Sequence, residues 1–195
     1  AASGQDPVAA VRRDAASFGV IRTILQMDKP QADIDGCRAA HQRLLAVVGA
    51  LGDGHFPQPS RLPGWSVAHV LTHLARNAEA MCRRVEGAMR SEMVEQYAGG
   101  SSGRAAEIEG GSQRQPMEIR EDVIESSTRL DALFELVPDD VWGRPVRTVA
   151  GGEHPAGLLP FRRWREVEYT SSILDVALVR LIGRTASWTG RSHGS

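Results

Sequence analysis

The apolar residues of this chain recur at alternating steps of three and four over long stretches, which is the spacing that places them on one side of an α-helix. The first stretch runs from Ile34 to Leu51 and is followed at once by a Gly-Asp-Gly run, which favours a helix end. The second stretch opens at Ser66, a residue type that caps helix N-termini, and continues through Ala88.

Two further stretches follow the same pattern. One runs from about Met117 to Leu136 and is ended by Pro138. The other begins near Leu159, with Pro160 in its first turn where proline is tolerated, and is expected to continue as far as Leu181. Four helices of about 15 to 25 residues with little strand signal predict an all-α fold, an up-down four-helix bundle.

Two connections between these helices are long. Residues 97–111 are rich in glycine and serine and carry a polar cluster of Arg104, Glu107 and Glu109. This composition predicts a long loop, with or without a short helical turn, and such loops are often functional. Residues 142–157 contain paired glycines and a β-branched stretch from Val146 to Val149, which predict a loop that pairs briefly as a hairpin.

Composition excludes some classes of function. The formal net charge is −1, which is not typical of a nucleic-acid-binding or membrane-binding surface. Within the 195 residues no apolar run approaches the roughly 20 residues that span a bilayer. The two cysteines, Cys37 and Cys82, fall within helical patterns and are expected to be buried thiols rather than a disulfide. These features predict a cytoplasmic protein.

The two ends of the chain differ from its middle. Residues 1–30 keep no sustained apolar period, and Met27 would serve as a native start, so we expect a leader or poorly ordered segment there. The bundle is then expected to occupy residues 31–182.

Two histidines are the first candidates for a site. His69 and His73 stand four apart on the second helix, so they share a face and lie about 6 Å apart along its axis. Neutral imidazoles at this spacing can converge on one metal ion, but capping, packing or a solvated face is the more common explanation. Glu166 lies in a charged run, and from the charge pattern alone an ordinary solvated helix face with ion pairs is the favoured explanation. A bundle can bring His73 and Glu166 together from separate helices, although spacing alone does not show it.

A longer sequence motif around the two histidines favours a metal site over an ordinary helix face. Residues 62–77 read L-P-G-W-S-V-A-H-V-L-T-H-L-A-R-N. They closely resemble the signature L-P-G-W-[ST]-x-x-H-[VL]-[LI]-x-H-[LV]-A-x-N of the N-terminal domain of the mycothiol-dependent maleylpyruvate isomerase family, one of the DinB-like metal-binding bundles. The resemblance covers about residues 34 to 168, and its further matches are Glu107–Gly111, the 122–130 helix segment, Trp142 and the R-W-R-E-V-E string at 163–168.

The resemblance implies a DinB-like bundle that holds a divalent metal, usually zinc, through three side chains and uses mycothiol as its thiol. Carried over to this chain, His73 and Glu166 match two of the metal ligands. Thr170 stands where the family has its third ligand, a histidine, and a threonine hydroxyl is a poor zinc ligand because it stays protonated. His69 resembles the family's other histidine, which is not a ligand, and its implied role is to orient or pack beside the site.

A shift of the reading frame could explain why the sequence departs from the family motif at Thr170. The family continues after this point with H-x-V-D-L-G, and a reading frame displaced by one base can encode such a sequence here. We therefore hypothesise that residues 169–195 are an aberrant, frameshifted tail, which the encoding DNA would settle.

Three functions compete at this stage. The leading one is a metal-dependent, mycothiol-using isomerase or thiol S-transferase, whose partners are a small-molecule thiol and an electrophilic substrate. The second is a non-catalytic or truncated helical-bundle binding module with a degraded metal site, which Thr170 favours. The third, a plain structural helical protein, explains the apolar stripes but not the two family strings.

Overall fold

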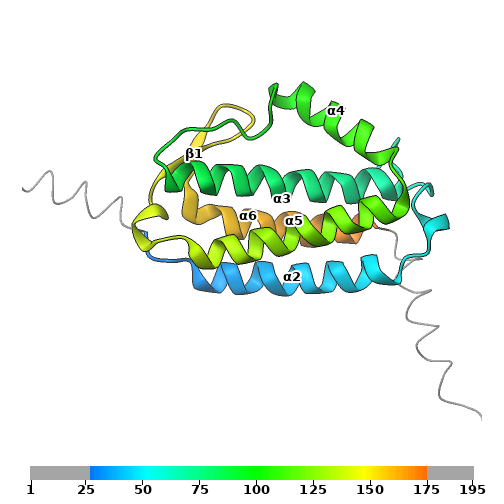
Figure 1. Ribbon diagram of the computed structural model, residues 1–195, viewed down its shortest axis with the longest axis horizontal. Coiled ribbons are helices and arrows are strands. Elements are labelled where there is room, and N and C mark those ends of the chain that lie inside the picture. Colours follow the sequence, from blue (N-terminus) through cyan, green and yellow to red (C-terminus); the bar gives the residue numbers. More distant parts are fainter. Residues whose placement is uncertain (1–26, 175–195) are drawn as a thin grey trace, which may run out of the picture.

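Four long helices form the body of the protein in the computed structural model, which describes residues 27–174 (Figure 1). They are α2 (Gln31–Ala50), α3 (Val67–Met89), α5 (Pro116–Leu136) and α6 (Leu159–Ile173). A fifth helix, α4 (Gly100–Ser112), lies along α3 outside the bundle. The connections hold short elements: the 3₁₀ turns η1 (Asp53–His55), η2 (Asp139–Val141) and η3 (Ala156–Leu158), and the strands β1 (Pro145–Arg147) and β2 (Glu153–Pro155).

The long helices run up and down the bundle in two pairs. Helices α2 and α6 run in one direction, and α3 and α5 run in the other (Figure 1). Each helix packs against two neighbours: α2 against α5 and α6, and α3 against the same two. Helix α4 returns along α3, so α5 starts at the same end as α3 and runs parallel to it.

The core follows the predicted apolar stripes. Residues such as Leu44, Leu71 and Val123 are at most 1% exposed and lie in one continuous cluster. A close approach joins α2 to α6 at Gly36, where a Cβ atom would lie 2.6 Å from the indole of Trp164. Glycine at this position therefore lets the indole pack directly on the α2 backbone.

The four-helix bundle predicted from the sequence is confirmed, with helix boundaries close to the expected ones. Ser66 caps α3 as expected, by accepting a hydrogen bond from the His69 amide at 3.4 Å. The strand pairing is also confirmed, since β1 and β2 form an antiparallel pair. The expectation of a loop at residues 97–111 is wrong in its larger part, because α4 occupies thirteen residues.

The amino-acid composition of α4 does not predict a helix. Its thirteen residues include four glycines and three serines, which lower helix propensity. Its contact with α3 stabilises it instead, through the burial of Ile108.

Some predictions lie outside the described residues. They include residues 1–26 of the leader predicted at residues 1–30, and most of the suspected frameshifted tail. Helix α6 is described up to Ile173, so the expectation that it continues to Leu181 also falls partly outside. None of the helices within residues 27–174 has both the length and the apolar character needed to cross a membrane.

Candidate metal centre

His73 and Glu166 meet between α3 and α6. The two helices are antiparallel, and the Nε2 atom of His73 lies 2.7 Å from Oε1 of Glu166 although the residues are 93 positions apart. The side chain of His73 is 8% exposed and that of Glu166 is 35% exposed. The pair therefore sits at the edge of the core, with the carboxylate on the solvent side.

Arg104, on α4, determines which ring nitrogen of a neutral His73 carries the proton. Its guanidinium donates a hydrogen bond to Nδ1 of His73 at 3.1 Å. A neutral His73 must then carry its proton on Nε2 and donate it to Glu166. This hydrogen bond lowers the pKa of Glu166, against the opposing effect of burial, and the charge of Arg163 adds to the lowering.

Thr170 completes the group of residues predicted from the sequence. It lies one turn beyond Glu166 on α6, it is 2% exposed, and its hydroxyl donates to Oε1 of Glu166 at 3.4 Å. The structure thus brings His73, Glu166 and Thr170 around one carboxylate oxygen.

The donors at this point fit a divalent metal in part. An imidazole nitrogen and a carboxylate oxygen that already converge are two ligands that zinc prefers. The neutral hydroxyl of Thr170 is a weak third donor. His73 and Glu166 would hold the ion, and a firm third protein ligand is missing from the group.

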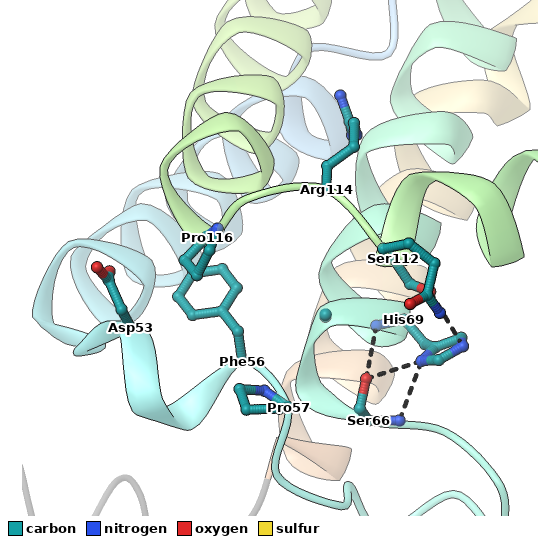
Figure 2. A pocket seen from close by; sticks show the side chains of 10 residues that line it. Asp53, Phe56, Pro57, Ser66, His69, Ser112, Arg114 and Pro116 are labelled. Atoms are coloured by element: carbon teal, nitrogen blue, oxygen red, sulfur yellow. Dashed lines mark hydrogen bonds between the residues drawn. The ribbon is translucent and has the colours of Figure 1, made fainter.

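His69 belongs to the helix cap rather than to this group. Its Nδ1 accepts hydrogen bonds from the amide and the hydroxyl of Ser66, at 3.2 and 2.7 Å. Its Nε2 donates toward Glu109 and Ser112, and its ring stacks on Trp65. Figure 2 shows the hydrogen bonds between His69 and Ser66 at the wall of a cavity of about 480 Å³, whose lining does not include His73 or Glu166.

Two contacts of this region had only faint signals in the sequence. Arg104 was part of the polar cluster at residues 97–111, but nothing in the sequence indicated that it reaches His73. Trp65 was part of the family string, and its indole contacts both His69 and His73, with its centroid 5.8 Å from the ring of His73. Both depend on how α4 and the α3 N-terminus fold over the site.

A second group of metal-type residues lies deeper in the bundle. Cys37, His41 and Asp131 bring a thiol, an imidazole and a carboxylate within 4.8 Å of one another. Nδ1 of His41 donates to Asp131 at 2.7 Å, and Nε2 accepts from the guanidinium of Arg163 at 2.9 Å. Arg163 is fully buried and also donates to the carbonyl of Leu74 and to Asn77.

This second group does not suit a cation. Both nitrogens of His41 already have partners, and one partner is itself a buried positive charge. Burial raises the pKa of the Cys37 thiol to about 12, so this side chain is not a thiolate at neutral pH. A metal ion here would have to displace Arg163, so the group is a polar network of the core that joins all four long helices.

A helical bundle with this arrangement has the fold of the DinB-like proteins. The chain belongs to the mycothiol maleylpyruvate isomerase N-terminal domain family, whose sequence profile matches residues 37–169.

Solved structures agree with this assignment. The chain is similar to the mycothiol-dependent maleylpyruvate isomerase, with a TM-score of 0.71 and 26% identity over 80% of this chain and 67% of the other. A histidine-to-alanine mutant of that enzyme gives a TM-score of 0.70 and 23% identity, over 85% of this chain and 73% of the other.

A more distant structure shares the fold alone. YfiT from Bacillus subtilis, described as a probable metal-dependent hydrolase with an unusual four-helix bundle topology, gives a TM-score of 0.57 and 17% identity, over 82% of this chain and 88% of the other. No curated protein matches the chain significantly.

Proposed function

We propose that this domain holds a divalent metal, zinc by preference, between His73 and Glu166 and uses it to act on the thiol of mycothiol. The reaction would be a thiol-dependent isomerisation or an S-transfer to an electrophile. The observation that carries the proposal is the 2.7 Å contact between His73 and Glu166, which joins two helices at the positions of the family's ligands.

The residues around the pair prepare it for this role. A bound divalent ion lowers the pKa of a thiol and so supplies the reactive thiolate at neutral pH. Arg104 and Trp65 fix the orientation of the His73 ring from two sides. Glu166 is held ionised by its neighbours, because its pKa is lowered, so its negative charge is ready for a cation.

The solvent-exposed side of the His73–Glu166 pair adjoins a groove that could admit the substrates. Glu166 lines a groove of about 320 Å³ together with Arg162, Arg165 and Tyr169 on the outer face of α6. This groove would admit a small thiol and an electrophile to the exposed side of the carboxylate. The two arginines would attract an electrophile that carries negative charge.

The compartment follows from the same chemistry. Mycothiol can act as a cofactor only where thiols stay reduced, and the protein's two cysteines are both buried and unpaired. We therefore extend the proposal to a cytoplasmic location and to small molecules as the partners.

A second function is favoured by Thr170. With a hydroxyl in place of the third ligand, the site would bind metal weakly, and the bundle would then serve as a non-catalytic binding module. The contact of Thr170 with Glu166 supports this alternative, because the hydroxyl occupies a lone pair of the carboxylate without adding a strong donor.

The experiment that separates the two functions measures metal and thiol together. Apo protein is titrated with zinc by calorimetry, and mycothiol is then added while thiolate absorbance is recorded as a function of pH. The proposal predicts one zinc per chain and a thiol pKa lowered only in the presence of protein and zinc. Glu166→Gln should abolish both signals, whereas Glu168→Gln, an exposed neighbour paired with Arg43, should leave them unchanged. Unchanged zinc binding in Glu166→Gln contradicts the proposal, and zinc binding without a thiol shift favours the binding module.

A further inference from the structure

Arg104 forms a hydrogen bond to one of the two residues of the proposed metal site. Its guanidinium donates to Nδ1 of His73 at 3.1 Å, while Nε2 of the same ring lies 2.7 Å from Oε1 of Glu166. A guanidinium has donors but no acceptor, so Nδ1 must offer a lone pair and the single proton of a neutral ring lies on Nε2. The bond that orients His73 therefore also fixes its tautomer, with a proton rather than a lone pair between Nε2 and Glu166.

This tautomer opposes the binding of a cation between His73 and Glu166. The hydrogen bond made by one ring nitrogen of a histidine decides whether the other can be a ligand. His73 can offer the lone pair of Nε2 only with its proton on Nδ1, and that N–H would then face the N–H group of Arg104. Two donors cannot share one hydrogen bond. The ring carries one proton in both cases, so the conflict involves no change in its charge.

Arg104 lies where a metal-binding histidine usually has an acceptor. Such a histidine generally donates its other N–H to a carboxylate, a backbone carbonyl or water. Arg104 is a donor, and among residues 27–174 no carboxylate forms an ion pair with it. Its guanidinium carbon lies over the ring of the buried Tyr97, 5.9 Å from the centroid. The described contacts thus direct the guanidinium toward His73.

The helix that carries Arg104 is lightly packed. Helix α4 lies along α3 outside the bundle, and two of its thirteen residues, Ile108 and Ser112, are buried (Figure 1). The chain enters it through Gly99 and Gly100, whose φ angles of 74° and 63° are accessible to glycine without strain. Elements with few buried contacts open at low cost. Helix α4 can therefore move Arg104 away from His73 while the four-helix core stays packed.

We propose that Arg104 regulates the metal site by competing with the metal for His73. In the metal-free protein it holds the tautomer that cannot bind through Nε2, and it must leave the ring when the site is occupied. This regulation rests on the metal-binding function proposed above. Because coupling between two events is reciprocal, contacts that hold α4 on α3 should weaken metal binding, and an occupied site should loosen α4.

The first test compares zinc affinities by calorimetry at one pH and ionic strength. Arg104→Met removes the competing donor and should raise zinc affinity at least about tenfold, because a hydrogen bond from a charged donor is worth that factor or more. Arg165→Met removes an equal charge from the exposed groove beside Glu166 and should change the affinity by no more than about threefold. Adding His73→Ala to Arg104→Met should cancel the gain.

Three results of this titration would overturn the proposal. They are an unchanged affinity in Arg104→Met, an equal gain in Arg165→Met, and a gain that persists when His73 is also replaced. The first would mean that Arg104 does not compete, the second that charge alone explains the effect, and the third that zinc binds elsewhere.

The second test uses the unmodified protein and does not depend on how the variants fold. Nitrogen NMR of the metal-free protein should show His73 protonated on Nε2 and unprotonated on Nδ1. On addition of zinc, amide hydrogen exchange in residues 100–112 should accelerate at least about fivefold, while α5 keeps its protection. A proton on Nδ1 in the metal-free protein, or unchanged exchange of α4 after zinc has bound, would contradict the proposed competition.

The outcomes also separate this regulation from the function on which it rests. If neither the unmodified protein nor Arg104→Met binds zinc, the metal-binding function fails and the regulation fails with it. If zinc binds through His73 with the same affinity in both proteins, the metal-binding function stands and only the role of Arg104 is wrong.

Discussion

Two groups of side chains in this bundle have the residue types of a metal site, and they differ in how deeply they are buried. At the edge, His73 faces Glu166, and the carboxylate adds negative charge that a cation would find favourable. In the core, His41 lies between Asp131 and the buried guanidinium of Arg163, so its Nε2 lone pair is already used. Arg104 donates to His73 in the same way, so each imidazole lies between a carboxylate and a guanidinium, and burial is what separates the two groups. Glu166 is 35% exposed, so an ion can reach the edge pair of His73 and Glu166 from solvent, whereas in the core group of Cys37, His41 and Asp131 it would have to displace the fully buried guanidinium of Arg163.

The largest expected effect comes from breaking the core group. Arg163→Met removes a fully buried donor to His41, Asn77 and the Leu74 carbonyl, and it should lower the free energy of unfolding by about 3–5 kcal/mol. Urea denaturation measures this loss. Arg129→Met serves as the exposed control, with an expected loss of at most about 1 kcal/mol. A similar small loss in both variants would mean that the core network does not hold the helices together.

Asp131→Asn should act on stability alone. It removes the charged acceptor of the His41 hydrogen bond, and we expect a loss of about 1–3 kcal/mol. Zinc affinity, measured by calorimetry, should stay within a factor of two of the unmodified protein. A strong loss of zinc binding in this variant would place the metal in the core after all.

Thr170→His should act on metal binding. The substitution adds an imidazole as a third ligand beside His73 and Glu166, and zinc affinity should rise at least tenfold, which is about 1.4 kcal/mol or more. A competition titration with a coloured chelator gives the two affinities. Thr170→Ser is the matched control and should bind zinc as the unmodified protein does. Equal zinc affinity in the histidine and serine variants would show that position 170 does not face the ion.

The core group should also give the protein a characteristic pH dependence. Burial lowers the pKa of His41 in the folded state, so below about pH 6.5 the unfolded chain takes up a proton that the folded protein does not. Stability is therefore fully present above that pH and falls as the pH drops toward the folded pKa, by up to about 1.4 kcal/mol per pH unit. His154 adds to this loss in the same direction. Denaturation curves between pH 7 and 5 measure it, and His41→Gln should have a flatter profile.

The smallest effect concerns the thiols. Cys37 and Cys82 are 0% and 1% exposed, and burial raises their pKa to about 12 and about 11. Neither should react with a thiol reagent in the native protein at pH 8, whereas both should react in denaturant. Rapid labelling of the native protein would show that the core opens locally at low cost.

The sequence predicted much of the fold because the bundle depends on long apolar stripes. The stripes located α2, α3 and α5 to within a few residues, and Ser66 correctly indicated where α3 begins. The glycine-rich α4 was mistaken for a loop, because tertiary contact rather than propensity stabilises it.

The candidate site was only partly accessible to the same reasoning. The family string indicated His73 and Glu166, and the antiparallel packing of α3 on α6 supplies the contact between them. Arg104 and the Asp131–His41–Arg163 network were not predicted, because they join helices whose relative rotation and register no local pattern encodes. Buried polar partners of this kind follow from the packed structure alone.

A metal ion should bind at the edge pair of His73 and Glu166 and not in the core group of Cys37, His41 and Asp131. Zinc titration of three metal-free proteins tests it most directly: the unmodified chain, His73→Ala and Cys37→Ala, the last being a small change in the core. We predict one zinc per chain for the unmodified protein, the same affinity for Cys37→Ala, and at least a tenfold loss for His73→Ala. Zinc binding that survives in His73→Ala and is lost in Cys37→Ala would contradict the account.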